Sequence, residues 1–80
     1  MGKNKEKLHT IISNALEINI SEVSKDMTIE NTSSWDSLNM VKIVLELEKE
    51  FGIRLDLNEI IEIQGLDDIE KLLKINDLDI

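Results

Sequence analysis

The segment from Ser37 to Phe51 constrains the fold of this chain more than any other part of the sequence. Its apolar residues recur at helical spacing, and neither proline nor glycine interrupts them before Gly52, a residue type that commonly ends helices. At about 100° per residue, the apolar side chains cover an arc of roughly 200°, about twice the width that one packing face needs. The sequence therefore predicts a helix that either packs on two sides or keeps an apolar stripe for a partner protein.

The two parts of this arc are expected to differ in burial. One part contains Met40, Ile43, Val44, Leu47 and Phe51, of which we expect Met40, Leu47 and Phe51 to be buried. The other part contains Leu38, Val41 and Leu45, with Glu48 at its border. If the surplus of apolar surface serves a partner, this second set forms the contact surface and stays exposed.

The rest of the chain contains three more segments with helical signals. A stripe of apolar residues predicts a first helix over residues 3–17. A short helix is predicted over residues 58–63, before Gly65. A last helix is predicted to begin with Asp67 as its N-cap, because the spacing from Asp67 to Glu70 matches a capping box.

Two segments lack a helical pattern. Residues 18–31 are predicted to form a long loop, and such a loop is uncommon in a small domain unless it has a function. We expect four of its apolar residues to pin it to the core: Ile20, Val23, Met27 and Ile29. Residues 76–80 are expected to fray.

The length and composition favour one small all-α domain. A chain of 80 residues suits a single domain. Trp35 and Phe51 are the only aromatic residues, so leucine, isoleucine and valine must fill the core. We therefore predict one domain over residues 1–80, ordered over about 3–75, that folds as a small four-helix bundle with three longer helices and one short one.

Charge and composition argue against several classes of function. Nine basic and seventeen acidic residues give a net charge of −8, which would repel nucleic-acid phosphates and anionic membrane surfaces. No apolar run approaches the ~18 residues of a membrane span, and the first residues do not resemble a signal peptide. The expected location is therefore the cytoplasm. Because the chain has no cysteine, it offers neither a disulfide nor a protein thiol.

The sequence contains few residues in patterns that suit catalysis. His9 is the only histidine, and it is interpreted as a residue at the border of the first helix's apolar stripe. Ser37 lacks the Gly-x-Ser-x-Gly surroundings of a nucleophile elbow and has no second histidine as a base. No segment matches a calcium-binding loop or a phosphate-binding glycine loop. The chain is therefore not expected to be an enzyme or to bind a metal ion by itself.

Asp36 and Ser37 offer the most distinctive chemistry in the chain. Asp36 suits the N-cap of the helix that begins at Ser37, and it leaves the Ser37 hydroxyl exposed on the first turn. A phosphate ester at that position would meet free backbone N–H groups and the positive end of the helix dipole. The sequence therefore predicts that Ser37 carries a group.

The wider context of this serine is similar to a known family. Asp36-Ser37-Leu38 is followed by Val41, Leu45, Leu47-Glu48 and Phe51-Gly52-Ile53, and this series resembles the acyl carrier protein family. In that family, Asp-Ser-Leu opens the second of four helices. The length, the acidity and the long first loop of this chain agree with the resemblance, which covers nearly all of it.

The resemblance implies a carrier rather than a catalyst. It implies that Ser37 receives 4′-phosphopantetheine from coenzyme A through a phosphopantetheinyl transferase, with Asp36 and Leu38 beside the attachment point. The terminal thiol of the arm would carry acyl groups as thioesters between acyl-loading and acyl-transferring enzymes. Leu38, Val41 and Leu45 match positions that the family presents to partners, and the carrier is expected to be a monomer.

Departures from the family pattern leave some questions open. The run before Asp36 is Ser33-Ser34-Trp35, whereas carriers of fatty-acid synthesis usually have Leu-Gly-x, and Lys42 and Lys49 make the helix less uniformly acidic. These differences favour a stand-alone carrier of a specialised pathway, such as polysaccharide, lipid or secondary-metabolite assembly. Trp35 is interpreted either as a staple that pins the loop to the helix or as a partner contact.

The sequence leaves two alternatives to an acyl carrier open. The chain could be an unmodified helical interaction module, because serine is common at helix starts. It could also be a peptidyl or aminoacyl carrier, although such carriers usually have glycine where this chain has Asp36.

Overall fold

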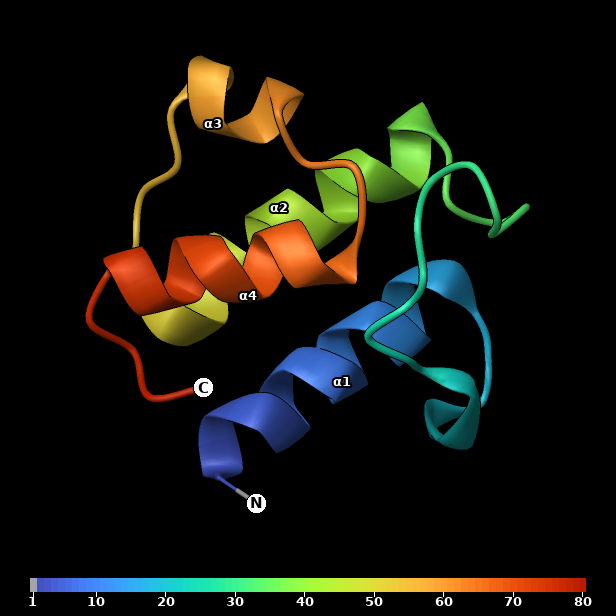
Figure 1. Ribbon diagram of the computed structural model, residues 1–80, viewed down its shortest axis with the longest axis horizontal. Coiled ribbons are helices and arrows are strands. Elements are labelled where there is room, and N and C mark those ends of the chain that lie inside the picture. The colour runs from blue at the N-terminus through green and yellow to red at the C-terminus, as the bar shows by residue number, and fades with distance from the viewer. Residues whose placement is uncertain (1) are drawn as a thin grey trace.

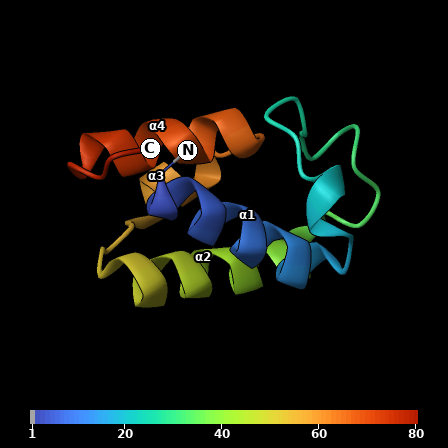
Figure 2. The same ribbon diagram turned by 90° about the horizontal axis from the view of Figure 1, so that it is seen from below.

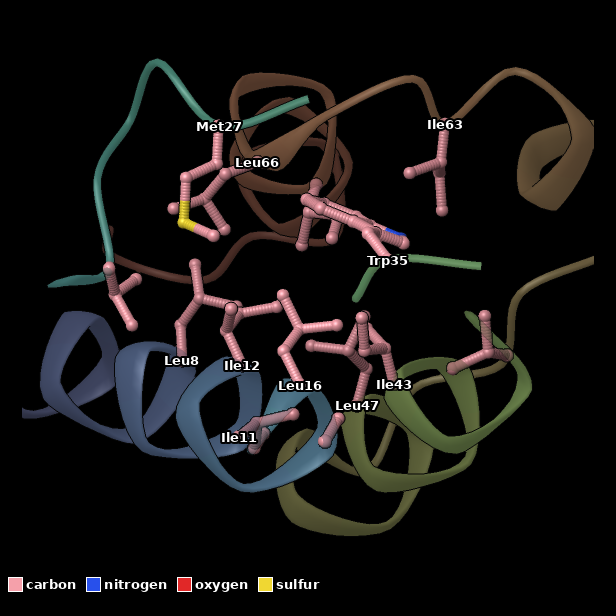
Figure 3. Packing of buried hydrophobic residues seen from close by; sticks show 14 of the residues in the cluster. Leu8, Ile11, Ile12, Leu16, Met27, Trp35, Ile43, Leu47, Ile63 and Leu66 are labelled. Atoms are coloured by element: carbon pink, nitrogen blue, oxygen red, sulfur yellow. The ribbon is translucent and has the colours of Figure 1, made fainter. Parts of the chain in front are cut away.

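Four α-helices and one short 3-10 helix make up the computed structural model, which describes residues 2–80 (Figure 1). The elements are α1 (Lys3–Leu16), η1 (Ile20–Glu22), α2 (Ser37–Phe51), α3 (Leu57–Ile61) and α4 (Leu66–Ile75). The two longest helices, α1 and α2, run antiparallel and pack side by side. Helix α4 lies over α2 in Figure 1 and apart from it in Figure 2, and the buried side chains lie between α4 and the α1–α2 pair (Figure 3). Three longer helices and one short one confirm the predicted all-α fold.

The ends of α1 and α2 follow local signals. Helix α2 begins at Ser37 and ends at Phe51, as predicted, and Gly52 adopts the left-handed conformation with φ 63°. Glycine accepts this conformation because it has no Cβ atom to clash with the backbone. Helix α1 ends at Leu16, one residue earlier than predicted, because Glu17 itself adopts the left-handed conformation with φ 57°.

The core lies between the helices and the long loop, with Trp35 near its middle (Figure 3). Helix α1 contributes the face that its sequence pattern predicts, and α4 contributes a second apolar face. The largest fully buried side chains are those of Trp35, Leu8, Ile12, Ile43, Leu47, Ile63, Leu66, Ile69 and Leu73. With one aromatic residue among them, aliphatic side chains fill the core as expected.

The segment between α1 and α2 spans residues 17–36, so it contains the loop predicted over residues 18–31 and, unlike the prediction, includes the short helix η1. This long loop is tied to the segment between α3 and α4. Thr28 and Gly65 form an isolated antiparallel bridge. The Ile29 N–H donates to the carbonyl oxygen of Gln64 (2.9 Å), and the Leu66 N–H donates to that of Met27 (3.0 Å). A Cβ atom at position 65 would lie 2.5 Å from the Met27 carbonyl oxygen, so this approach requires glycine.

The apolar residues of the loop differ in how deeply they are buried. Val23 and Met27 are buried and Ile29 packs partly against the core, as predicted. Ile20 is 52% exposed, so the expectation that it pins the loop is wrong. It lies in η1, a short helical turn whose residues are all exposed.

The start of α4 differs from the prediction. Its N-cap is Gly65 rather than Asp67, and the helix already begins at Leu66. The Met27 carbonyl oxygen accepts the Leu66 N–H and replaces a side-chain cap. Asp67 instead forms ion pairs with Lys25 (3.7 Å) and Lys71 (3.4 Å), while Glu70 is buried. The capping box of the chain's second half is at α3, where Asp56 and Glu59 bond reciprocally.

The last residues contact the rest of the chain, and their expected fraying stays a prediction. Asp77 adopts the left-handed conformation with φ 65°, and the Leu78 N–H donates to the Leu73 carbonyl oxygen (3.0 Å), which closes α4. The Asn4 side-chain amide donates to the Asp79 carbonyl oxygen (3.1 Å), so the tail lies against the start of α1. Leu78 and Ile80 pack partly on the core.

Candidate functional site

The first turn of α2 is held by two hydrogen bonds that reach back into the loop. The Asp36 carboxylate Oδ1 accepts the Asn39 N–H (2.9 Å), and the Asp36 backbone is extended, as an N-cap requires. The Asn39 side-chain amide donates to the Ser34 carbonyl oxygen (2.6 Å). The sequence predicts the Asp36 cap, whereas the contact of Asn39 could not be expected from helix patterns alone.

Ser37 occupies the first position of α2, and its side chain is exposed. Backbone N–H groups at the start of a helix have no acceptor one turn earlier in the helix, and the Asp36 carboxylate accepts only that of Asn39. A phosphate ester on the Ser37 oxygen would therefore lie at the positive end of the α2 dipole, near N–H groups that can bond it. The geometry fits a serine that carries a phosphate-linked group.

A groove of about 260 Å³ opens beside Ser37, between α2, α3 and the long loop. Its lining is mostly apolar and comprises Ile29, Asp36, Ser37, Met40, Ile60, Ile61, Ile63 and Gln64. Sequence reasoning did not place these residues together, because they come from three separate segments. The Ile60-Ile61 pair, which is too apolar for a five-residue surface helix, is the one signal that could have pointed to it.

Trp35 lies directly before this site, but its side chain is only 2% exposed. The indole packs in the core among α1, α2 and α4 residues (Figure 3). This burial corrects the expectation that Trp35 contacts a partner and supports its interpretation as a packed anchor of the loop. Its indole nitrogen Nε1 has no hydrogen-bond acceptor among residues 2–80.

The outer face of α2 carries the predicted apolar stripe. Leu38, Val41 and Leu45 are 67%, 54% and 59% exposed. On the inner side, Leu47 is fully buried, as predicted, whereas Met40 and Phe51 are half-buried. Lys7 covers part of the Phe51 ring, because its ammonium group lies 5.4 Å from the ring centroid.

Glu48, the fourth candidate partner residue on α2, has an intramolecular role. Its Oε2 accepts the Leu55 N–H (2.9 Å), and its side chain is half-buried. This bond holds the segment between α2 and α3 against α2. One carboxylate oxygen is therefore engaged within the chain, and helix periodicity does not predict this contact.

Comparisons with known proteins agree with this geometry. The family model described as "Phosphopantetheine attachment site" matches residues 6–73, which include all four α-helices except the first residues of α1 and the last of α4. This chain belongs to the acyl carrier protein family. It is 33% identical over 69 residues to "Polyketide-8 synthase acyl carrier protein 2" of Streptomyces avermitilis, covering 86% of this chain and 79% of the relative.

Other acyl carrier proteins are similarly related. The "Acyl carrier protein" of Nitratidesulfovibrio vulgaris (strain DSM 19637 / Miyazaki F) is 31% identical over 72 residues, which cover 90% of this chain and 83% of the relative. The "Acyl carrier protein" of Thermotoga maritima is 32% identical over 63 residues, which cover 79% and 78%. The resemblance inferred from the Asp36-Ser37-Leu38 context is thereby confirmed.

Membership in the family establishes the cofactor class. The family attaches a 4′-phosphopantetheine prosthetic group, and its members are carriers on which partner enzymes act. An exposed serine at a capped helix start, with an apolar groove beside it, fits this group and its cargo. Within residues 2–80, none of the helices has both the length and the apolar character that crossing a membrane requires.

Proposed function

We propose that this chain carries acyl groups as thioesters on a 4′-phosphopantetheine arm attached to Ser37. The observation that carries this proposal is the exposed Ser37 hydroxyl on the first turn of α2, fixed by the Asp36 cap, inside the matched family region. The arm supplies the terminal thiol that this cysteine-free chain lacks. The chain itself is the carrier and supplies no catalytic residue.

The residues around Ser37 have separable tasks in this proposal. Asp36 fixes the first turn, so that the hydroxyl is presented on a formed helix to the transferase. The N–H groups of the first turn bond the phosphate, and the apolar groove beside Ser37 shields part of the cargo from water. Tethering keeps the cargo at a high effective concentration near each docked enzyme.

The partner surface in this proposal is the stripe of Leu38, Val41 and Leu45. Its exposure on the outer face of α2, next to Ser37, supports contacts with a phosphopantetheinyl transferase and with acyl-loading and acyl-transferring enzymes. Lys42 and Lys49 are also exposed on this helix. The similarity to a polyketide synthase carrier and the Ser33-Ser34-Trp35 run support a specialised pathway over housekeeping fatty-acid synthesis. The monomeric state and the cytoplasmic location stay predictions.

Enzymatic modification tests the proposal directly. Incubation of the purified chain with coenzyme A and a broad-specificity phosphopantetheinyl transferase should add one phosphopantetheinyl group, measured by intact-mass spectrometry. Ser37→Ala should abolish the addition, because it removes the acceptor hydroxyl. Ser33→Ala is the matched control, since Ser33 is also exposed but lies in the loop, and it should be modified like the wild type. An addition that survives Ser37→Ala, or no addition to the wild type, contradicts the proposal.

A further inference from the structure

Gln64 lines the groove beside Ser37 from the segment between α3 and α4. Its backbone is bonded on both sides, because its N–H donates to Oδ2 of Asp68 (2.9 Å) and its carbonyl oxygen accepts the Ile29 N–H (2.9 Å). The bridge between Thr28 and Gly65 follows directly. The side chain of Gln64 therefore leaves the backbone at a point that is fixed relative to the groove.

The side-chain amide of Gln64 is free within the chain. It is exposed, and it makes no hydrogen bond to any other group in residues 2–80, although both backbone groups of Gln64 are engaged. Four other side-chain amides, by contrast, donate to backbone carbonyl oxygens: those of Asn4, Asn31, Asn39 and Asn76. The amide of Gln64 is thus available to a ligand in the groove.

The chemistry of the lining makes this amide distinctive. Five lining residues offer only hydrocarbon or thioether surface, namely Ile29, Met40, Ile60, Ile61 and Ile63. The carboxylate of Asp36 accepts hydrogen bonds and does not donate them. Ser37 loses its hydroxyl hydrogen when a phosphate ester forms on its oxygen. Once Ser37 is esterified, Gln64 is therefore the only lining side chain that can donate a hydrogen bond.

A group tethered to Ser37 brings hydrogen-bond acceptors to this groove. The 4′-phosphopantetheine arm contains amide carbonyls, and an acyl group adds the carbonyl of its thioester. A carbonyl oxygen that leaves water for an apolar groove costs free energy unless it finds a donor there. Among the side chains of the lining, Gln64 provides that donor.

We propose that the side-chain amide of Gln64 donates a hydrogen bond to a carbonyl oxygen of the group tethered to Ser37. The acceptor is an amide carbonyl of the arm or the carbonyl of the acyl cargo, which share the same hydrogen-bonding chemistry. The bond holds the tethered group against the groove when no partner enzyme is docked. This inference rests on the function proposed above, because the group reaches the groove from Ser37.

Gln64 is the only glutamine in the chain, so labelling with ¹⁵N-glutamine gives one pair of side-chain NH₂ signals in a proton–nitrogen correlation spectrum. The unloaded chain is compared with two loaded forms, whose arms end in an octyl thioether or in an octanoyl group on a hydrolysis-resistant amide. Intact mass verifies the loading of each form. In a loaded form, one NH₂ proton should move downfield and exchange with water about twofold to tenfold more slowly, the range of one net hydrogen bond.

The two loaded forms distinguish the sources of the acceptor. The octyl thioether has no oxygen in its cargo, so slower exchange in this form assigns the acceptor to the arm. Slower exchange that appears only with the octanoyl form assigns it to the carbonyl of the cargo. Either result supports a hydrogen bond from Gln64 to the tethered group.

Gln64→Met tests the donor, since it keeps an unbranched side chain of similar length and removes the amide. Asn58→Leu is the matched control, because it also removes an exposed side-chain amide but lies on α3 outside the lining of the groove. In the wild type, the tethered group should show nuclear Overhauser contacts with methyl groups of Met40 and Ile60. Gln64→Met should weaken these contacts about twofold to tenfold, whereas Asn58→Leu should leave them unchanged.

Two results would overturn the inference. One is exchange of the Gln64 NH₂ protons that is equally fast in the unloaded and both loaded forms, even if their signals shift, because the charge of the phosphate alone can shift a signal. The other is a set of groove contacts that Gln64→Met leaves unchanged or that Asn58→Leu weakens equally. The first result needs only the wild-type chain, so it does not depend on the folding of a variant. Intact mass still shows whether Ser37 is loaded, so failure of this inference is distinguishable from failure of the proposed function.

Discussion

Asp36 joins the loop to α2 and decides how Ser37 is presented. Its carboxylate accepts the Asn39 N–H, and its own carbonyl oxygen accepts the Met40 N–H (2.8 Å). Both bonds belong to the first turn, so the cap and the serine form one local unit. Substitution of the cap therefore tests the proposed site and the helix start together.

We expect Asp36→Ala to lower the free energy of unfolding by about 0.5–2 kcal/mol, as loss of an N-cap does. It should also slow modification of Ser37, because the transferase then meets a frayed first turn. Chemical denaturation and a timed mass assay measure the two effects. Asp36→Asn separates capping from charge, since asparagine caps nearly as well. If Asp36→Ala changes neither quantity, the cap does not organise this site.

The sequence predicts residues of the site where their roles are local. Asp36, Ser37 and Leu38 are adjacent, so cap chemistry and the family context are enough to find them. Glu48 and Trp35 are different, because their roles depend on Leu55 and on the core, which helix periodicity does not place. The same limit hides the groove, whose walls come from the loop, α2 and α3.

At the scale of the element, α2 combines a buried face with an exposed apolar stripe. The inner face contains Leu47, which is fully buried between α1 and the rest of the core, and the outer face contains Val41. The two residues are both aliphatic and less than two helical turns apart. They therefore form a matched pair for separating folding from docking.

Leu47→Ala should lower the free energy of unfolding by about 2–5 kcal/mol, as the loss of buried methyl groups and the resulting cavity do. Val41→Glu should change it by no more than about 0.5 kcal/mol, because the side chain already contacts water. The second variant should nevertheless slow modification by the transferase. Thermal unfolding and the mass assay check both expectations. Equal destabilisation by the two changes would place both faces in the core and remove the docking stripe.

The helices differ in how well their own local sequences predict where they begin and end. The bounds of α2 are predicted to the residue, because the Asp36 cap and the left-handed Gly52 are local signals. The start of α4 is not, since the Met27 carbonyl oxygen, far away in the sequence, caps Leu66 in place of Asp67. The position of the tail likewise depends on a distant contact, that between Asn4 and Asp79.

At the scale of the whole molecule, the close approach of Thr28 and Gly65 fixes the long loop over the core. Gly65→Ala should lower the free energy of unfolding by about 1–3 kcal/mol, because its Cβ would overlap the Met27 carbonyl oxygen and force the two segments apart. Gln64→Ala is the control. It keeps the backbone bond to Ile29 and alters an exposed side chain, so we expect a change within about 0.5 kcal/mol. Urea unfolding distinguishes the two, and equal stabilities would show that the bridge is not a constraint.

The contact between Asn4 and Asp79 has a mechanical consequence. It brings the two ends of the described chain together, and both figures place them away from the start of α2, where Ser37 lies. A domain whose two ends are neighbours can be inserted into a loop of a host protein without distortion. It can also be tethered to a surface by either end. In both arrangements Ser37, the residue on which we propose that the cargo is carried, would lie away from the point of attachment.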